Sequence, residues 1–523
     1  MAEGYCPSGY DITDFAMIRF AIILFVLSLP PIAWAQGTLI TNANKAAEEF
    51  RQSLESVAVW CDRRGLKEEA AFARSAILPQ YPDRMCIPKF PLEQGTLALE
   101  KGIPKSLPRD CVAYVTGADD ERPEGKTWTD AQMARSYLVS LREKYAKDLS
   151  MMAKVACRQA RGTLATQLAM AALHANPDHP QLRAAFGFVK YKNQWRTPWE
   201  VKMLKDGYVD HPRFGWLPKS HLEKYEAGQR YYKDRWISAE EDARLHANYK
   251  NGWVIESEHY LIATTHSIEE GVRLRNQLEH FYRAWKMIFY RYAATDEELA
   301  SYFSGKVTPK IPAYRHKIVV YRDRAEFMRE TRSDAGGFYY TGDKCCHFYA
   351  HGPDQSDREK NATLGTMYHE ATHQLFSEIE GQVKWGGSKQ NYWIIEGVAV
   401  FMESFRQQDG FYTVGNRNAW RVEQARQLWR EKKIGLSMSE MLDVNSAVWK
   451  KFMDDEAINL YSQVAGIFQF LMFADGGRYR DPLIVYLQQV YDDKDTPRTF
   501  QQLLKLMPEE FDEKYRQSMD ARE

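Results

Sequence analysis

The residues best suited to chemistry form the segment His369-Glu370-Ala371-Thr372-His373, an H-E-x-x-H pattern. Residues four apart share one face of a helix, so both imidazoles could bind a single metal ion. Imidazole is a common zinc ligand, and a zinc site that keeps one position open for water can catalyse hydrolysis. A chance match is the alternative, in which case both histidines are ordinary residues on an amphipathic helix.

Glu396 is the third candidate ligand. It lies in Trp393–Ala399 (WIIEGVA), within an apolar helix predicted to run to about Phe405. A carboxylate in such a stretch is costly to bury without a partner, and a metal ion is a suitable partner. A glutamate in an exposed first helical turn is the alternative, because the helix dipole favours it there. The segment 381–387 would let this helix fold back on the first.

Together the H-E-x-x-H pattern and the downstream W-x-x-E-G-x-A resemble the gluzincin metallopeptidases, in particular a group of uncharacterised exported bacterial proteins. The G-G-[FY]-Y pattern of that group matches the segment 336–339 here. The resemblance covers about residues 250–490, and residues 176–244 are similar to the region that precedes the domain in that group. It implies an α+β zincin-like (gluzincin) domain with a small mixed sheet and a helical C-terminal part.

The resemblance also implies one Zn²⁺ ion, with His369, His373 and Glu396 as its ligands. Zinc lowers the pKa of its bound water to about 7. Glu370 would then be the general base, taking the proton as this water attacks a peptide carbonyl and passing it on to the leaving amine. Glu403, seven residues after Glu396, could orient a ligand imidazole through a hydrogen bond.

The chain departs from thermolysin-like enzymes in two places. Those enzymes use a downstream histidine to stabilise the oxyanion, whereas His373 is the last histidine in this chain. They also carry an acid four residues after the third ligand, where this sequence has Val400. Aminopeptidase-like gluzincins use a tyrosine for the oxyanion, so Tyr461 is the candidate donor. A core aromatic is its alternative role.

Cys345, Cys346, His347 and His351 suggest another metal site. Neighbours in a strand point to opposite faces, so one tetrahedral site that uses all four is not expected, and ordinary strand residues or a cysteine paired with another cysteine are the favoured alternatives. We expect the strand 344–350 to be the edge of the sheet above the cleft, where an extended peptide could add through backbone hydrogen bonds. The glycines at 336–337 would allow close approach there, or form a plain turn.

The elements that must position these residues start near residue 250. The segment 253–265 has strand composition, and Ser267 with Glu270 forms a capping-box signature at the start of a long helix. Residues 316–321 form a second strand, and Phe338–Tyr340 and Lys344–Ala350 form a hairpin joined at Gly342-Asp343. After Asn361 almost the whole chain is predicted to be helical.

The N-terminal part is predicted to be mainly α-helical. Helices are expected over 42–76 and 128–174, with loops over 77–127, and the segment NPDHPQLRAAFGF resembles a tetratricopeptide hairpin. A weak repeat relates Tyr191-Lys192-x-x-Trp195 to Tyr232-Lys233-x-x-Trp236, by common structure or by chance. We predict a signal peptide at 1–35, a helical domain at 36–175, Trp-containing modules at 176–249 and the metallopeptidase domain at 250–523.

An apolar run with an A-x-A site marks the leader. Phe20–Leu29 is followed by Pro30-Pro31 and then by Ala33-Trp34-Ala35. This core is too short to span a bilayer, so cleavage is expected to leave no stable membrane span. The acidic residues before it suggest that translation starts at Met17. We therefore expect export to the periplasm, the cell envelope or the medium, where the six cysteines after the leader could form disulfides.

The 70 basic and 70 acidic side chains balance, which argues against a nucleic-acid partner. The sequence predicts an exported zinc metallohydrolase, specifically a peptidase that acts on peptides or proteins, with a helical region that positions substrate or binds a protein partner. A catalytically silent, zinc-stabilised binding or scaffold protein of the cell envelope is the alternative. Cleavage preference and the choice between trimming ends and internal cutting stay open.

Overall fold

The computed structural model describes most of the chain after the predicted leader, which itself lies outside the described residues. The described ranges are 38–90, 129–309, 314–350, 356–378, 383–384, 386–433, 435–452 and 457–520. They divide into two compact units. The first contains 38–78, 129–156 and 171–178, and the second contains 79–90, 157–170 and the described residues from 179 onward.

This division differs from the predicted domains. The first unit ends close to the predicted boundary at 175, but residues 79–90 and 157–170 belong to the second unit. The segments on both sides of the predicted boundary at 250 lie in the second unit, and that boundary stays a prediction. Strand pairing explains why residues 79–90 belong to the second unit. Strand β1 (Met85–Pro88), in a segment predicted to be loop, pairs with β14 (Phe411–Val414).

The first unit is helical, as predicted for this region. It contains α2 (Thr38–Arg63), α3 (Lys67–Ser75), most of α5 (Asp130–Arg158) and the end of α6 (Gly162–Ala175). The positive φ of Gly65 (73°) allows the sharp turn between α2 and α3. Phe50 stacks on Tyr145 with ring centroids 4.0 Å apart, which joins α2 to α5. The tetratricopeptide resemblance stays a prediction.

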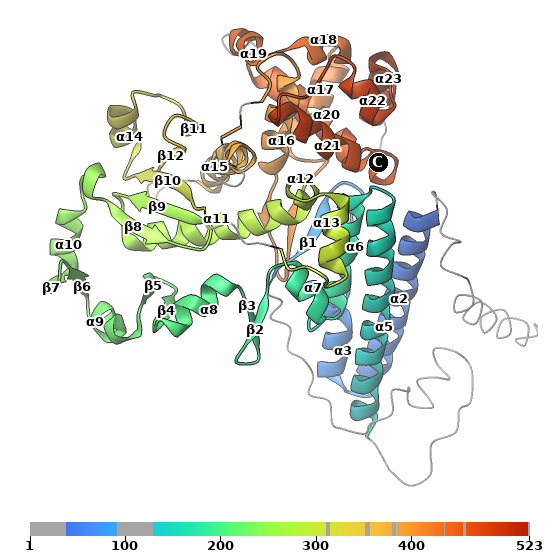
Figure 1. Cartoon of the computed structure of the whole chain (residues 1–523), viewed down its shortest axis with the longest axis horizontal. Coiled ribbons are helices and arrows are strands. Elements are labelled where there is room, and N and C mark those ends of the chain that lie inside the picture. The colour runs from blue at the N-terminus through green and yellow to red at the C-terminus, as the bar shows by residue number, and fades with distance from the viewer. Residues whose placement is uncertain are drawn as a thin grey trace, which may run out of the picture. The chain divides into compact units, whose positions relative to one another are not determined.

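Three hairpin-and-helix modules follow α7 (Pro180–Ala185) in the second unit and form a row in Figure 1. Their elements are β2 (Val189–Tyr191), β3 (Gln194–Arg196) and α8 (Pro198–Lys205); β4 (Tyr208–His211), β5 (Gly215–Pro218) and α9 (Leu222–Glu226); and β6 (Gln229–Tyr232), β7 (Arg235–Ser238) and α10 (Ala239–Leu245). The two predicted repeats are the outer modules, so the weak sequence match reflects common structure.

The middle module was not predicted. Its second strand carries Trp216, which takes the place of Trp195 and Trp236 in the other two modules. A glycine with positive φ precedes each hairpin, at residues 187, 207 and 228. The outer hairpins turn through two residues with positive φ, whereas the loop of the middle hairpin is longer and built differently. That difference hides the third copy from a residue-by-residue comparison.

A five-stranded mixed sheet forms the platform for the site. Its strands are β8 (Trp253–Glu256), β9 (Tyr260–Thr264), β10 (His316–Tyr321), β11 (Phe338–Tyr340) and β12 (Cys345–Tyr349). Their order is β11-β12-β10-β9-β8, with β9, β10 and β12 parallel and both outer strands antiparallel to their neighbours. The predicted small mixed sheet is therefore present.

Three details of the predicted sheet are wrong. The segment 253–265 forms two antiparallel strands, because the chain turns at Ser257–His259, where the backbone N–H of His259 donates to Glu279. The strand 344–350 is not the edge: β12 lies between β10 and β11, and β11 is the edge strand. The turn between β11 and β12 covers Thr341–Lys344 and includes a positive φ at Lys344, so it is longer than the predicted two residues.

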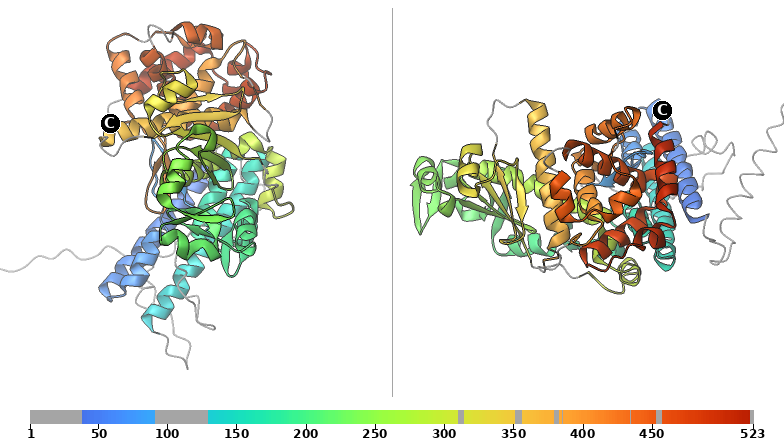
Figure 2. Two further views of the ribbon diagram at one scale, coloured as in Figure 1. Left: turned by 90° about the vertical axis from the view of Figure 1, so that its left-hand side faces the viewer. Right: turned by 90° about the horizontal axis from the view of Figure 1, so that it is seen from above.

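Two helices cross beside this sheet. α11 (Ile268–Ile288) starts after Ser267, whose hydroxyl accepts a hydrogen bond from the backbone N–H of Glu270. This is one half of the predicted capping box, because the carboxylate of Glu270 accepts from Arg273 instead. α15 (Asp357–Ser377) packs on β11 and β12, and α16 (Tyr392–Met402) packs on α15 and α20 (Ala457–Gly477). In the right-hand view of Figure 2, α15 lies between the sheet and the C-terminal helices.

The C-terminal part is helical, as predicted, apart from the small sheet β1-β14-β13. Its remaining strand is β13 (Arg406–Gln407), and the other helices of the second unit are α12 (Tyr290–Ala293), α13 (Asp296–Phe303), α14 (Arg324–Thr331), α17 (Trp420–Arg430), α18 (Met438–Asp443), α19 (Ser446–Phe452), α21 (Arg480–Tyr491), α22 (Thr499–Leu504) and α23 (Pro508–Asp520). The cysteines at 61, 86, 157, 345 and 346, which are those within the described residues, are all free thiols.

Candidate metal centre

α15 places both histidines of the H-E-x-x-H pattern on one face. The Nε2 atoms of His369 and His373 lie 3.1 Å apart. Both imidazoles are largely shielded from solvent, with side chains 9% and 15% exposed. The four-residue spacing therefore brings two ring nitrogens to one point, as the sequence predicted for a helix.

α16 brings Glu396 to the same point. Its Oε2 atom lies 3.3 Å from Nε2 of His369 and 3.6 Å from Nε2 of His373. α16 can lie this deep because Gly397 faces α20, where an added Cβ would stand 3.2 Å from the ring of Phe468. Glu396 is therefore buried within the interior and not at an exposed helix terminus, which removes the alternative interpretation of this residue.

These three side chains form a candidate metal-ligating group. Oε2 of Glu396 is buried and has no hydrogen-bond partner. Nδ1 of His369 lies 2.9 Å from Oε1 of Glu403, so a proton on Nδ1 leaves the Nε2 lone pair directed at Glu396. Two nitrogen ligands and one carboxylate oxygen are a donor set typical of catalytic zinc. The residues present fit the ion that the sequence predicted.

The electrostatics of the group also favour a cation. Burial opposes the charged form of His369, but Glu396 and Glu403 outweigh it and raise the pKa of the imidazole to about 10. Burial would raise the pKa of Glu396, but His373 and His369 hold it well below its usual range. The carboxylates thus create a place for positive charge in the interior, and a divalent cation would satisfy it.

Glu403 lies beside the imidazole of His369, as its seven-residue spacing from Glu396 predicted. Its other contacts come from Arg421, whose Nε and Nη2 donate to the carboxylate at 2.9 and 3.2 Å. Burial opposes ionisation of Glu403, yet His369 and Arg421 lower its pKa. The sequence did not reveal Arg421, because no local spacing links it to Glu403.

Glu370, the predicted general base, is held by the edge strand. The backbone N–H of Tyr339 in β11 donates to Oε2 of Glu370 at 2.9 Å. The hydroxyl of Tyr339 donates to Oε1 of the buried Glu378 at 2.9 Å. Burial raises the pKa of Glu370, against the opposing charges of His369 and His373. Strand β11 therefore fixes the carboxylate beside the ligand group, a contact that the sequence did not predict.

Tyr461 on α20 also lies at this group. Its ring centroid is 5.8 Å from that of His369, and the guanidinium of Arg421 lies 5.1 Å from the ring. Burial and the charge of Glu396 raise the pKa of the phenol, so it stays a neutral donor. Tyr392, one helical turn before Glu396, was missed: the Glu396 charge is the main cause that raises its pKa. Its i, i+4 spacing from Glu396 was the available signal.

The glycines before β11 differ in their roles. A Cβ on Gly337 would lie 2.5 Å from the ring of Phe348, so its close approach serves packing within the hairpin. A Cβ on Gly336 would meet nothing nearer than Thr366 of α15, at 3.7 Å. The predicted role of these glycines in peptide approach stays a prediction.

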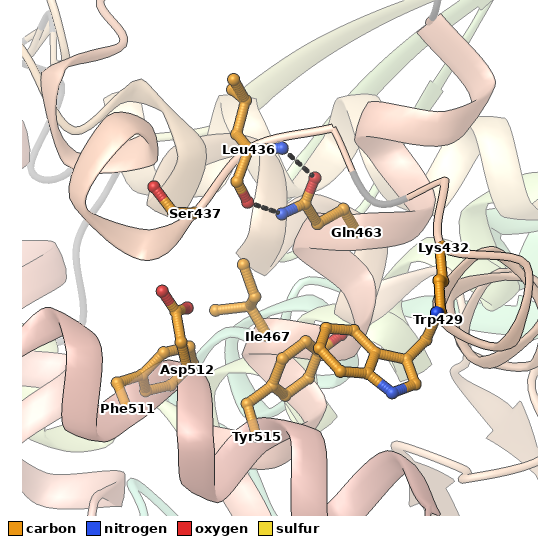
Figure 3. A pocket seen from close by; sticks show the side chains of 9 residues that line it. All are labelled: Trp429, Lys432, Leu436, Ser437, Gln463, Ile467, Phe511, Asp512 and Tyr515. Atoms are coloured by element: carbon orange, nitrogen blue, oxygen red, sulfur yellow. Dashed lines mark hydrogen bonds between the residues drawn. The ribbon is translucent and has the colours of Figure 1, made fainter.

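A pocket of about 320 Å³ lies elsewhere, among α17, α18, α20 and α23 (Figure 3). Apolar side chains such as Trp429 and Ile467 line it together with the carboxylate of Asp512. None of its lining residues belongs to the candidate metal group. The candidate metal group and this pocket are therefore separate features of the molecule.

Comparison with known proteins gave no match to any family model, curated protein or solved structure. Within the described residues, no helix has the length and apolar character needed to cross a membrane.

Proposed function

We propose that this protein is an exported zinc-dependent metallohydrolase of the gluzincin type, most simply a peptidase. One observation carries the proposal: Oε2 of the buried Glu396, without a hydrogen-bond partner, faces the Nε2 atoms of His369 and His373. A buried acceptor of this kind is costly unless a cation completes the group. The H-E-x-x-H pattern supplies Glu370 in addition, and a purely structural metal site has no need of that carboxylate.

A zinc ion held by these three ligands would polarise a substrate carbonyl and lower the pKa of water to about 7. Glu370 would accept the proton of the attacking water and later deliver it to the leaving amine. The N–H of Tyr339 keeps one oxygen of Glu370 in place for this exchange. The raised pKa of Glu370 suits a group that must both accept and release a proton near neutral pH.

Two phenols are available to stabilise charge on the carbonyl oxygen as water adds. Tyr461 and Tyr392 come from different helices, and the charge of Glu396 acts on both. We assign the donor role to Tyr461, because Arg421 lies over its ring and also binds Glu403. A neutral donor placed at the developing oxyanion contributes on the order of 3 kcal/mol to lowering the barrier.

Strand β11 offers a surface for an extended substrate. It is the edge of the sheet and lies on the same side as Glu370. An extended peptide can add to such an edge through backbone hydrogen bonds. The zincin-like fold, the leader at 1–35 and a substrate-positioning role for the helical region belong to the same proposal.

The test compares wild type with Glu370→Gln on a mixed peptide library, with zinc content measured in both. We expect equal zinc contents and a loss of hydrolysis of about 10²–10⁴-fold in the variant. His369→Ala should lose one zinc ion per chain relative to wild type. Glu423→Gln, at an exposed position of α17, is the matched control and should keep full activity.

Two outcomes would overturn the proposal. Equal hydrolysis by wild type and Glu370→Gln would show that Glu370 is not the base. Zinc content unaffected by His369→Ala would show that this group does not bind the ion. A wild type that loses zinc on His369→Ala but hydrolyses no peptide would favour the zinc-stabilised binding protein instead.

A further inference from the structure

The hairpin β11–β12 carries a second set of metal-ligating side chains. Cys346 points toward α15, where its Sγ lies 3.6 Å from the carbonyl oxygen of Glu370 and 3.4 Å from Oε1 of Gln374. Cys345 and His347 point to the opposite face, because neighbours in a strand alternate. Asp343, in the turn before β12, reaches this face as well. The face of the hairpin away from the predicted zinc site therefore gathers three different ligand types.

Their ligand atoms converge on one point. The carboxylate of Asp343, Sγ of Cys345 and a ring nitrogen of His347 all lie within 4.8 Å of one another. Oδ2 of Asp343 is 3.1 Å from Nε2 of His347. Cys345 and His347 are buried, with 5% and 7% of their surface exposed, whereas the Asp343 side chain is 49% exposed. Two ligands are thus fixed in the interior, and the third closes the group from the solvent side.

The imidazole of His347 is held with Nε2 directed at this point. Its Nδ1 lies 3.2 Å from the hydroxyl of the buried Tyr321. Its ring stacks on Phe338 with centroids 5.0 Å apart and an interplanar angle of 25°. A metal-ligating histidine commonly uses its second nitrogen for such a hydrogen bond, which fixes the ring and leaves the other lone pair for the metal.

We propose that Asp343, Cys345 and His347 bind a second zinc ion that stabilises the β11–β12 hairpin. The combination of thiolate, imidazole and carboxylate suits Zn²⁺, which accepts sulfur, nitrogen and oxygen together, and not the hard ions Mg²⁺ or Ca²⁺. Because the Asp343 side chain is 49% exposed, water would be the fourth ligand of the proposed ion. The same hairpin presents Tyr339 to Glu370, so the ion would stabilise the strand that holds the proposed base.

The inference does not depend on the proposed function, because it concerns other residues on the other face of the sheet. Cobalt substitution tests the two sites separately. Co²⁺ bound to a thiolate gives a sulfur-to-cobalt charge-transfer band in the near ultraviolet, and the His369 group contains no sulfur ligand. The experiment loads the full chain with Co²⁺ and records this band in wild type, Cys345→Ser and Cys346→Ser. We expect the band in wild type and in Cys346→Ser, and its loss in Cys345→Ser.

Zinc content gives an independent measurement. We expect two zinc ions per chain in wild type and one in Cys345→Ser, in His347→Asn and in His369→Ala. Cys346→Ser, the adjacent thiol on the opposite face, should retain both. Asp343→Asn changes an exposed side chain, so it reports on the site even if a substitution in the interior prevents folding, and it should weaken zinc binding there.

A folded wild type without the thiolate band would overturn the proposal, as would a band that survives Cys345→Ser. A wild type that holds one zinc, lost in His369→Ala and retained in Cys345→Ser, would show that Asp343 and His347 form only an ion pair beside a thiol. A wild type that holds one zinc, lost in Cys345→Ser, would instead support the second site and count against the proposed function.

Discussion

The two candidate ligand groups of this protein differ in how the chain assembles them. His369 and His373 come from one helix and Glu396 from another, so the first group exists only after α15 and α16 have packed together. Asp343, Cys345 and His347 come from one turn and the strand that follows it. The first group therefore depends on tertiary packing, whereas the second needs only a formed hairpin.

They also differ in charge. A zinc ion bound by two neutral imidazoles and one carboxylate retains a net charge of +1, and such a site remains a good Lewis acid. A thiolate, a carboxylate and a neutral imidazole cancel the charge of Zn²⁺ and leave little power to polarise a substrate. The first group is thus suited to catalysis and the second to holding structure, and the presence of Glu370 beside only the first agrees with that division.

The largest expected effect comes from removing the ligand that joins the two helices. Glu396→Ala should weaken zinc binding at the first group by more than 100-fold, because it removes the carboxylate and leaves two imidazoles facing an open space. Competition with a chromogenic chelator measures the affinity, and the cobalt–thiolate band monitors the second group. If Glu396→Ala weakened metal binding at both groups equally in a folded protein, the two groups would not be separate sites.

The next effect concerns the contact behind His369. Glu403→Ala should weaken zinc binding at the first group by about 10–100-fold, as is usual for a hydrogen-bond partner of a metal-ligating histidine. The loss should be near the upper end, because Arg421 would then be left without its carboxylate partner. Glu403→Gln retains an acceptor for Nδ1 of His369 and should recover part of the affinity. Equal affinities in wild type and Glu403→Ala would show that this contact does not tune the ligand.

Local patterns predicted the parts of this molecule that short spacings determine. The four-residue spacing of His369 and His373, the seven-residue step from Glu396 to Glu403 and the cap at Ser267 each depend on helix geometry alone. The helical character of the N-terminal region followed from apolar periodicity, and the strands from their composition, while the small mixed sheet was implied by the resemblance. The sequence resemblance added Tyr461, which the structure brings to within 5.8 Å of His369 between ring centroids.

Long-range pairing produced the rest and left little local signal. Arg421 reaches Glu403 across β13 and β14, and the N–H of Tyr339 could donate to Glu370 only because β11, not β12, is the edge strand. Backbone donors carry no side-chain signature, so this contact is invisible in the sequence. Alternation along β12 predicted that Cys345 and Cys346 point apart, but the contribution of Asp343 required the longer turn that the structure shows.

A smaller effect is expected at the corresponding contact of the second group. Tyr321→Phe removes the hydroxyl 3.2 Å from Nδ1 of His347 and retains the packing of the ring. Zinc binding at the second group should weaken by about 10-fold, the lower end for such partners, because the contact is neutral on both sides. Titration of the cobalt–thiolate band in wild type and variant measures the change. If Tyr321→Phe lowered zinc affinity as much as Glu403→Ala, a charged hydrogen-bond partner of the ligand histidine would have no greater effect than a neutral one.

The smallest effect tests whether changes at the second group affect the first group through the β11–β12 hairpin. Tyr339→Phe removes the hydroxyl that donates to Glu378 but retains the backbone N–H that donates to Glu370. Glu378 keeps the contact between its Oε2 and Nδ1 of His316, so the free energy of unfolding should fall by only about 1 kcal/mol, measured by urea denaturation. Both zinc ions should remain, and peptide hydrolysis should fall a few-fold, because β11 then holds Glu370 less rigidly.

Cys345→Ser should reduce hydrolysis in the same range if the second ion acts through this strand. Unchanged hydrolysis in Cys345→Ser, with the second zinc lost and the first retained, would show that the two groups share a hairpin but act independently.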